Sequence, residues 1–285
     1  MPQFSIIIPT HNRPNLLRRA VTSAVAAAGS NGEVIVVDDG SDAAASDALS
    51  DFSGAALRVL RHDVALAAGG SPARNTGAAA SEAPLLFFLD DDDELCSDYC
   101  DRIIDEALPN GAAFGFSARY FVSDTEEGEP ETVLETRRLG NGIVPDTARF
   151  YDKTFPFSAG FWMTKETYEV VGPFATNLST NSDTEYTCRL YASGRTPWYS
   201  EVPGVRVYDP DQKPSSEIDS VTRRTKSADR AAAFRAIAET NAKFLKQDSS
   251  AARFVYGRLM KHSFRAGHRM DALVAALHVG LRALV

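Results

Sequence analysis

The chain has 285 residues, enough for one large domain or for a domain with an appendage. Its formal net charge is −8, and Lys and Arg form no block or stripe, so no nucleic-acid partner is expected, because phosphate backbones are bound by clustered cations. Hydrophobic residues make up 44% of the chain, which suffices for a sizeable core, but no apolar segment approaches the roughly 20 residues that span a bilayer.

The cysteines and the N-terminal stretch predict the compartment. Cys96, Cys100 and Cys188 lack the paired spacings of a disulfide framework or a zinc site, as is typical of proteins in a reducing compartment. The N-terminal stretch lacks the basic region and the long apolar region of a signal peptide. We therefore expect a cytoplasmic protein, either free or peripheral to the inner face of the membrane.

The first part of the chain, residues 1–110, alternates strand-like and helix-like segments. Short apolar, β-branched runs predict buried strands, at residues 4–8, 33–37, 57–61 and 85–89. Helical periodicity or helix start signals mark the segments between them, at residues 16–28, after residue 42 and at 72–81. Strands separated by helices of this length predict an α/β fold with a mostly parallel, doubly wound sheet.

The middle of the chain, residues 111–215, has a different pattern. Alternating residues predict antiparallel strands around an acidic turn at 124–131. A strand with a short helix follows, and then a helix with a polar start that ends at Gly194. We expect a smaller, antiparallel region here.

The final part, residues 216–285, predicts a C-terminal helical extension. Its helices are expected over residues 220–247 and 251–285. The last segment is amphipathic with scattered basic residues, which is typical of a core helix or of a helix in a homodimer, and a peripheral membrane contact is the alternative.

Polar loops collect where three predicted strands end, at residues 9–13, 38–42 and 90–94. In open α/β sheets, ligands bind outside the carboxyl ends of the strands. The last of these loops holds four consecutive aspartates, residues 90–93, whose mutual repulsion requires compensation. Aspartates two residues apart in a strand point to the same side, and their hard oxygen atoms suit Mg²⁺ or Mn²⁺. The run predicts a metal site, with a solvated acidic turn as the alternative.

Two further observations concern the chemistry of this edge. The chain has no glycine-rich phosphate-binding loop, so a bound diphosphate would need a metal ion to neutralise its charge. Asp183 stands at the start of the helical segment "SDTEYTCRL". A carboxylate at this position either caps the helix or removes a proton from a hydroxyl nucleophile.

Five stretches of the chain resemble the family 2 glycosyltransferases of the GT-A fold. They are "FSIIIPTHNRPNLLRRAVTSA", "EVIVVDDGSD", "PARNTGAAASEAPLLFFLDDDDEL", "SAGFWMTKETYEVVGPF" and "NSDTEYTCRLYASG", in the family's order, and they span roughly residues 4 to 208. The resemblance implies a Rossmann-like GT-A sheet, a nucleotide-diphospho-sugar donor with UDP favoured, and Mn²⁺ or Mg²⁺ as cofactor. It also implies transfer, with inversion, to a hydroxyl of an unidentified glycan, glycolipid or natural product.

The resemblance assigns roles on the donor side of the site. Pro9, Thr10 and Asn12 match the loop that wraps the nucleoside. Asp39 matches the carboxylate that binds the edge of the base, and Arg74 matches a basic position that faces the nucleotide. By the same resemblance, residues 1–110 would bind the nucleotide sugar.

The remaining assignments concern the metal and the base. Asp90 and Asp91 would lie toward the ribose and the diphosphate, Asp92 would coordinate the metal, and Asp183 would be the catalytic base. Residues 111–215 would then bind the acceptor and carry out catalysis.

The chain departs from the family pattern at two positions. Ser182 replaces a frequent Glu, which leaves Asp183 as the base and Glu185 as the nearest substitute. Many members have a His after the strand that corresponds to "VRVY", whereas this chain has "YDPDQ". Either Asp209 or Asp211 takes the place of that His near the metal, or the third protein ligand is missing.

Two other functions would share aspartates at strand ends. A metal-dependent phosphotransferase or nucleotidyltransferase is one, but the first strand lacks an Asp nucleophile and is followed by a poor version of a Gly-rich, basic loop. A non-catalytic sugar-nucleotide-binding module is the other, and the retention of Asp39, Asp92 and Asp183 argues against it.

Overall fold

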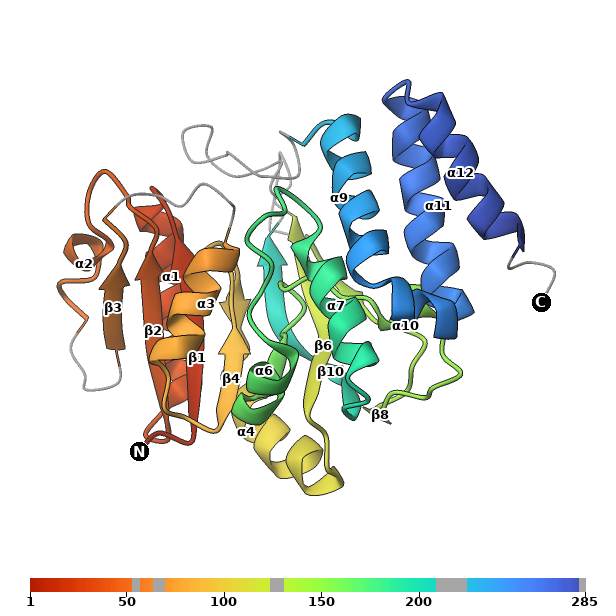
Figure 1. Ribbon diagram of the computed structural model, residues 1–285. Coiled ribbons are helices and arrows are strands. Elements are labelled where there is room, and N and C mark those ends of the chain that lie inside the picture. Colours follow the sequence, from red (N-terminus) through yellow and green to blue (C-terminus); the bar gives the residue numbers. More distant parts are fainter. Residues whose placement is uncertain (53–56, 64–69, 124–130, 209–224, 282–285) are drawn as a thin grey trace.

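The computed structural model describes residues 1–52, 57–63, 70–123, 131–208 and 225–281. Among these residues, no helix combines the length and the apolar character needed to span a membrane. The chain forms a central sheet with helices on both faces, and further helices stand together at one end (Figure 1).

The sheet has ten strands in the order β3-β2-β1-β4-β9-β6-β10-β5, with β7 paired to β6 and β8 paired to β10. The strands are β1 (Phe4–Thr10), β2 (Gly32–Asp38), β3 (Leu57–Arg61), β4 (Leu85–Phe88), β5 (Glu94–Leu95), β6 (Phe114–Ser123), β7 (Glu131–Glu135), β8 (Gly142–Ile143), β9 (Trp162–Thr164) and β10 (Pro197–Tyr208). The first four strands are parallel, as predicted. The antiparallel pair expected around residues 124–131 is β6 with β7, and residues 124–130 of the turn between them lie outside the described residues. The strand β9 is antiparallel to both its neighbours, whereas β10 is parallel to β6, and all these strands join the same sheet. The division of the chain at residues 110 and 215 stays a prediction.

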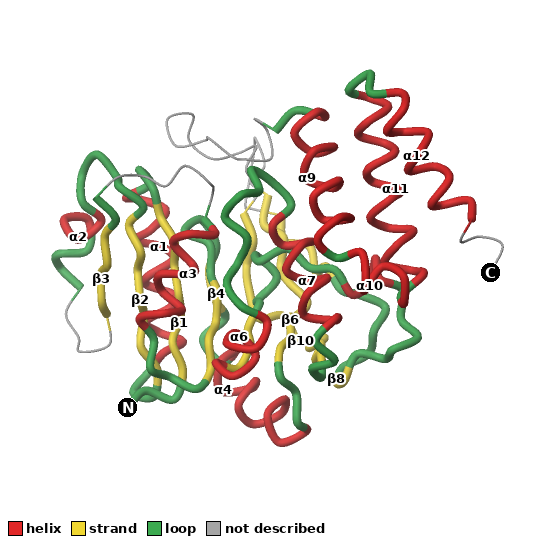
Figure 2. The backbone as a smooth tube through the Cα atoms, in the orientation of Figure 1, coloured by secondary structure: helices red, strands yellow, loops and turns green. Residues whose placement is uncertain are grey.

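Helices follow most of the strands, as Figure 2 shows. They are α1 (Pro14–Ala28), α2 (Ala45–Ala48), α3 (Ser71–Ala80), α4 (Tyr99–Arg102), α5 (Phe150–Lys153), α6 (Lys165–Val171), α7 (Ser182–Ala192), α9 (Ser227–Thr240), α10 (Ala242–Gln247), α11 (Ser249–Arg265) and α12 (Arg269–Leu281). A π-helical turn, Ile103–Ala107, continues α4. The segment expected to be helical over 251–285 forms α11 and α12, which are separated near Gly267, whose φ of 80° lies in the left-handed region that ends helices.

The core follows from the alternation of side chains along the buried strands. On β1, Ile6 and Ile8 pack with α1, whereas Ile7 faces the other way and packs with Ala78 of α3. Gly77 allows this approach, because a Cβ atom there would lie 2.5 Å from Cγ2 of Ile7. The two helices thereby hold β1 in place and fix the direction in which its carboxyl end points.

The C-terminal helices α9, α11 and α12 pack against one another and against the sheet domain (Figure 1). Their shared core includes Phe234, Ile237 and Val255, and it reaches Phe150 and Cys188 of the preceding part of the chain. The extension is therefore fixed to the sheet domain through an apolar core. On α12, four apolar side chains are exposed, namely Met270, Leu273, Val274 and Leu277. A homodimer or membrane contact through these helices stays a prediction.

Candidate active site

The carboxyl ends of β1, β2 and β4 meet at one edge of the sheet, as the strand order requires. Thr10 pairs with Asp38 across β1 and β2, and Ile7 pairs with Phe88 across β1 and β4. The loops beyond them are in direct contact, because the hydroxyl of Thr10 donates a hydrogen bond of 2.8 Å to Oδ2 of Asp91. The sequence rule for strand ends thus places the predicted donor residues together.

Asp38 stabilises the turn after β2, in which Asp39 lies. Burial alone would raise the pKa of Asp38, but hydrogen bonds from Ser41 and Ala45, together with the charge of Arg61, outweigh it and lower the pKa. The backbone N–H groups of Ser41 and Ala45 donate to the two carboxylate oxygens at 2.8 and 2.9 Å. Asp38 is fully buried, so it acts on the loop and leaves Asp39 at the edge.

Asp39 is held by two histidines from neighbouring strand ends. Nδ1 of His62 lies 2.8 Å from Oδ1 of Asp39, and Nε2 of the same ring lies 2.9 Å from the hydroxyl of Thr76. Nδ1 of His11 lies 2.9 Å from the backbone oxygen of Asp39. His62 was not predicted to belong to the site, although it directly follows β3, and the rule that placed Asp39 at a strand end applies equally to it.

Asn12 connects the first strand-end loop to the second. Its φ is 54°, in the left-handed region, and its side-chain oxygen accepts a hydrogen bond of 2.8 Å from the N–H of Asp42. Its own N–H donates to the hydroxyl of Ser41 at 2.9 Å. Together with Pro9 at the end of β1, Asn12 therefore fixes the shape of the loop expected around the nucleoside.

The carboxylates of the four consecutive aspartates have different surroundings. Asp91 turns inward, where Nη1 of Arg13 lies 2.9 Å from its Oδ1, and the same nitrogen lies 3.3 Å from Oδ2 of Asp92. Burial is the largest influence on Asp91 and raises its pKa to about 6, although Arg13 opposes this shift. Asp90 forms an ion pair with Arg74. Two arginines thus provide compensation for the repulsion within the run.

Asp90, Asp92 and Asp93 form a group that fits a divalent cation. Each has a carboxylate oxygen within 4.8 Å of the others, whereas Asp91 does not belong to the group. An all-oxygen, acidic donor set suits Mg²⁺ or Mn²⁺. The i, i+2 spacing predicted a metal-binding pair within the run without naming its members, and the resemblance assigned only Asp92 to the metal. Asp93 was not assigned a role, although it is almost fully buried. Asp209 and Asp211 lie outside the described residues.

Asp183 lies in the first turn of α7 and is partly buried. The N-cap residue is Asn181, so Asp183 is not the cap, but its Oδ1 accepts a hydrogen bond of 2.6 Å from the N–H of Thr184. Burial raises the pKa of Asp183, the charge of Asp90 acts in the same direction, and Arg74 opposes them. Asp183 is therefore within electrostatic reach of the Arg74–Asp90 pair at the strand-end edge.

The surroundings of Asp183 distinguish it from Glu185. Glu185 is buried and forms a two-pronged ion pair with Arg189, at 2.8 and 2.9 Å. Arg74, which pairs with Asp90 and acts on Asp183, is buried as well, and its guanidinium carbon lies 4.8 Å from the ring centroid of Phe157. Because Glu185 is committed to Arg189, Asp183 is the carboxylate of α7 that suits a base at this site.

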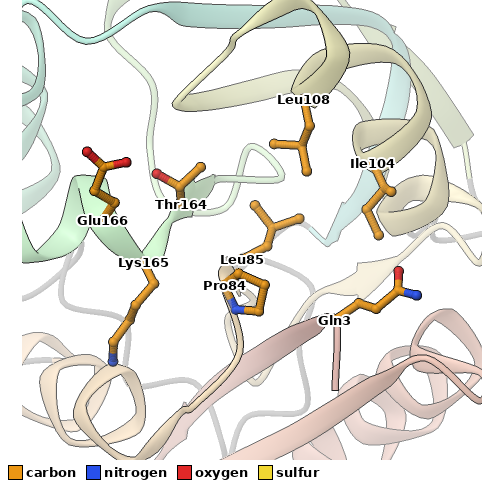
Figure 3. Close-up of a pocket in the computed structure, with 8 residues that line it drawn as sticks. All are labelled: Gln3, Pro84, Leu85, Ile104, Leu108, Thr164, Lys165 and Glu166. Atoms are coloured by element: carbon orange, nitrogen blue, oxygen red, sulfur yellow. The ribbon is translucent and has the colours of Figure 1, made fainter. Parts of the chain in front are cut away.

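A cavity of about 440 Å³ lies at the opposite edge of the sheet (Figure 3). Gln3 and Leu85, at the starts of β1 and β4, line it together with Ile104 and Leu108. The ammonium group of Lys165 points away from it and donates to the backbone oxygens of α3 and the residues after it. None of the strand-end aspartates lines this cavity, so it is separate from the site.

Comparison with known proteins identifies what this chain resembles. The family described as "Glycosyl transferase family 2" matches residues 5–172. Among solved structures, S. aureus TarS 1–349 in complex with UDP-GlcNAc aligns with a TM-score of 0.70 and 16% identity, covering 92% of this chain and 73% of that chain. The UDP complex of the same protein aligns with a TM-score of 0.67 and 16% identity, covering 92% and 72% of the two chains. No curated protein sequence matches the chain significantly.

Proposed function

Because the chain belongs to glycosyl transferase family 2, we propose that it transfers a sugar from a nucleotide-diphospho-sugar, with UDP favoured, to an acceptor hydroxyl. It is a glycosyltransferase of the GT-A fold, as the resemblance of its sequence implied. The finer elements of the proposal are inversion at the anomeric carbon, a divalent metal, and the roles of individual residues.

One observation carries the proposal. A single edge of the sheet gathers the carboxylate of Asp39, the acidic group of Asp90, Asp92 and Asp93, and a separate carboxylate on α7 within electrostatic reach of both Asp90 and Arg74. Similar structures hold UDP and UDP-GlcNAc, which supports a nucleotide sugar as the donor. A binding module would need the first two features but has no use for the third.

The donor would lie across the ends of β1, β2 and β4. Asp39 accepts a hydrogen bond from an N–H group on the edge of a pyrimidine base, and His62 fixes the orientation of its carboxylate. Asn12 shapes the loop against the nucleoside. Asp90, Asp92 and Asp93 would hold Mn²⁺ or Mg²⁺, which when bound stabilises negative charge on the leaving diphosphate.

Asp183 supplies the base. It takes the proton of the acceptor hydroxyl while that oxygen forms a bond with the anomeric carbon, and the bond between that carbon and the diphosphate breaks, with its electron pair leaving on UDP. Since burial raises its pKa, the Asp183 carboxylate holds the proton more strongly than an ordinary aspartate does. Attack from the face opposite to the leaving group inverts the anomeric carbon.

Calorimetric titration tests the donor proposal directly. We expect UDP to bind the Mn²⁺-loaded protein more tightly than dTDP or GDP does, and UDP to be released from a panel of UDP-sugars when an acceptor is present. Asp92→Asn should weaken UDP binding, whereas Asp183→Asn should retain binding and lose transfer. If none of the three diphosphates binds, the donor proposal is wrong, and if both variants transfer at the wild-type rate, the residue roles are wrong.

A further inference from the structure

A second cavity, of about 270 Å³, connects the proposed base with the C-terminal helices. Asp183 and Thr184 line it from α7, and Arg137 and Tyr151 line it from the segments before α7. Its other wall comes from α9 and α11. The helices α9 and α11 lie beyond residue 172, where the match to the family ends.

The charge of this cavity is opposite to that of the strand-end edge. Arg137, Arg230 and Arg258 line it, and Asp183 is the single carboxylate among its described lining residues. Within the part of the chain that the structure describes, no ion pair joins Arg137 or Arg258 to a carboxylate. Their guanidinium carbons lie over aromatic rings instead, at 5.8 Å from Tyr151 and 5.3 Å from Phe254. Aromatic faces position an arginine but leave its N–H groups for another partner.

His262 adds a polar atom in the same wall. It follows Arg258 by one helical turn on α11 and is 6% exposed, and its ring stacks against Phe234 of α9 at a centroid distance of 5.9 Å. Among the described residues, its buried Nδ1 has no hydrogen-bond partner. A buried nitrogen without a partner costs free energy, which a ligand that fills the cavity would recover.

These features together describe a site for a negatively charged oxygen group. Guanidinium groups present paired N–H donors that match the geometry of phosphate and carboxylate oxygens. We propose that the cavity binds a phosphate ester or a carboxylate of the acceptor, and thereby orients the acceptor hydroxyl toward Asp183. The inference rests on the proposed function, because it takes Asp183 as the base.

The location of the cavity favours the acceptor over the donor as the source of this group. The diphosphate of the donor is expected at the aspartates that follow β4, none of which lines the cavity. Asp183 borders both regions, since it lines the cavity and is within electrostatic reach of Asp90. A molecule in the cavity would therefore reach the base from outside the region expected for the donor diphosphate. The C-terminal helices would then be part of the substrate site.

The test titrates small anions into the protein after UDP and Mn²⁺ have filled the donor site. The probes are glucose 6-phosphate, glucuronate and glucose. They share one sugar skeleton and differ in a single group, which is a phosphate ester, a carboxylate or a neutral hydroxyl. The proteins are the wild type, a double variant with Arg137→Gln and Arg258→Gln, and a matched control. The control is Arg253→Gln with Arg265→Gln, because these two arginines are exposed on the same helix α11 and do not line the cavity.

We expect at least one of the two anions to bind the wild type, glucose not to bind, and the cavity variant to bind that anion at least about tenfold more weakly. The control should differ from the wild type by less than about twofold. UDP binding and the midpoint of thermal unfolding, measured on every variant, should stay unchanged. If neither anion binds, or if the cavity variant binds as the wild type does, the inference is overturned. If none of UDP, dTDP and GDP binds the wild type, the proposed function fails instead.

Discussion

The strand-end edge and the cavity beside Asp183 are assembled in different ways. At the edge, Thr10 ends a parallel strand, Asp39 and Asp91 lie in loops that follow parallel strands, and the strand order alone brings them together. In the cavity, Arg137 and Arg258 meet because a helical extension packs against the sheet domain through an apolar core. The edge is acidic and the cavity is basic, so the two regions are suited to different ligands.

Because of this difference, we expect substitutions in the two regions to affect different measured quantities. Changes at the edge should alter the affinity for UDP, and changes on the side of Asp183 should alter transfer without altering that affinity.

The largest effect is expected for Asp183→Asn. The change removes the proton acceptor but keeps a side-chain oxygen for the N–H of Thr184, so we expect the transfer rate to fall by about 10²–10⁴-fold while the affinity for UDP stays the same. Transfer to a verified acceptor and UDP calorimetry measure the two quantities. Glu169→Gln, which changes an exposed carboxylate on α6, serves as the control. Loss of UDP binding in Asp183→Asn would place this residue on the donor side.

The next effect concerns Asp92 and the divalent cation. Because Asp92 belongs to the acidic group, Asp92→Asn should weaken UDP binding in Mn²⁺ by about 10- to 100-fold, and a chelator should abolish the difference between variant and wild type.

Asp91→Asn provides the contrast for this measurement. Asp91 contacts Thr10 and Arg13 and lies outside the acidic group, so its effect on UDP binding should be the same with and without the metal. If a chelator leaves the defect of Asp92→Asn unchanged, Asp92 acts on the nucleotide or on the loop and not on a metal.

Sequence reasoning predicted much of the edge, because the edge depends on local signals. The apolar runs gave the strands, and the rule for parallel sheets placed Asp39 and the aspartate run at the same end. The partners of these residues were not predicted. His62 and Asp93 were assigned no role, because nothing in the local pattern singles out one histidine after a strand or the last of four consecutive aspartates.

The cavity could not be predicted from the sequence at all. Its arginines have ordinary spacings, and α9 and α11 show only the periodicity of packed helices. What brings Arg258 and His262 beside Asp183 is the way in which Phe234 and Val255 pack against Phe150. Such docking depends on the fit of apolar side chains that are far apart in the chain, and no local pattern encodes it.

The pH dependence of kcat/KM and that of UDP affinity should also differ. Burial raises the pKa of Asp183, so the group is protonated, and unable to act as a base, at a higher pH than an ordinary aspartate is. We expect kcat/KM to fall about tenfold for each pH unit below this pKa, and to be level above it until another group titrates. UDP affinity, measured over the same range, should not follow this profile. A profile shared by both quantities would contradict the separation of the two regions.

The smallest effect is expected at His62. Its Nδ1 contacts Asp39, and its Nε2 contacts Thr76, so it orients a carboxylate that would bind the base without touching the nucleotide itself. His62→Leu removes one hydrogen bond to Asp39, worth about 1 kcal/mol, and should weaken UDP binding about fivefold. His62→Gln retains an N–H donor and should recover part of this loss. Transfer at saturating donor should be unchanged in both variants, because Asp183 and the cavity lie outside the contacts of His62. A defect in transfer at saturating donor, with normal UDP affinity, would show that the two regions are coupled through β3.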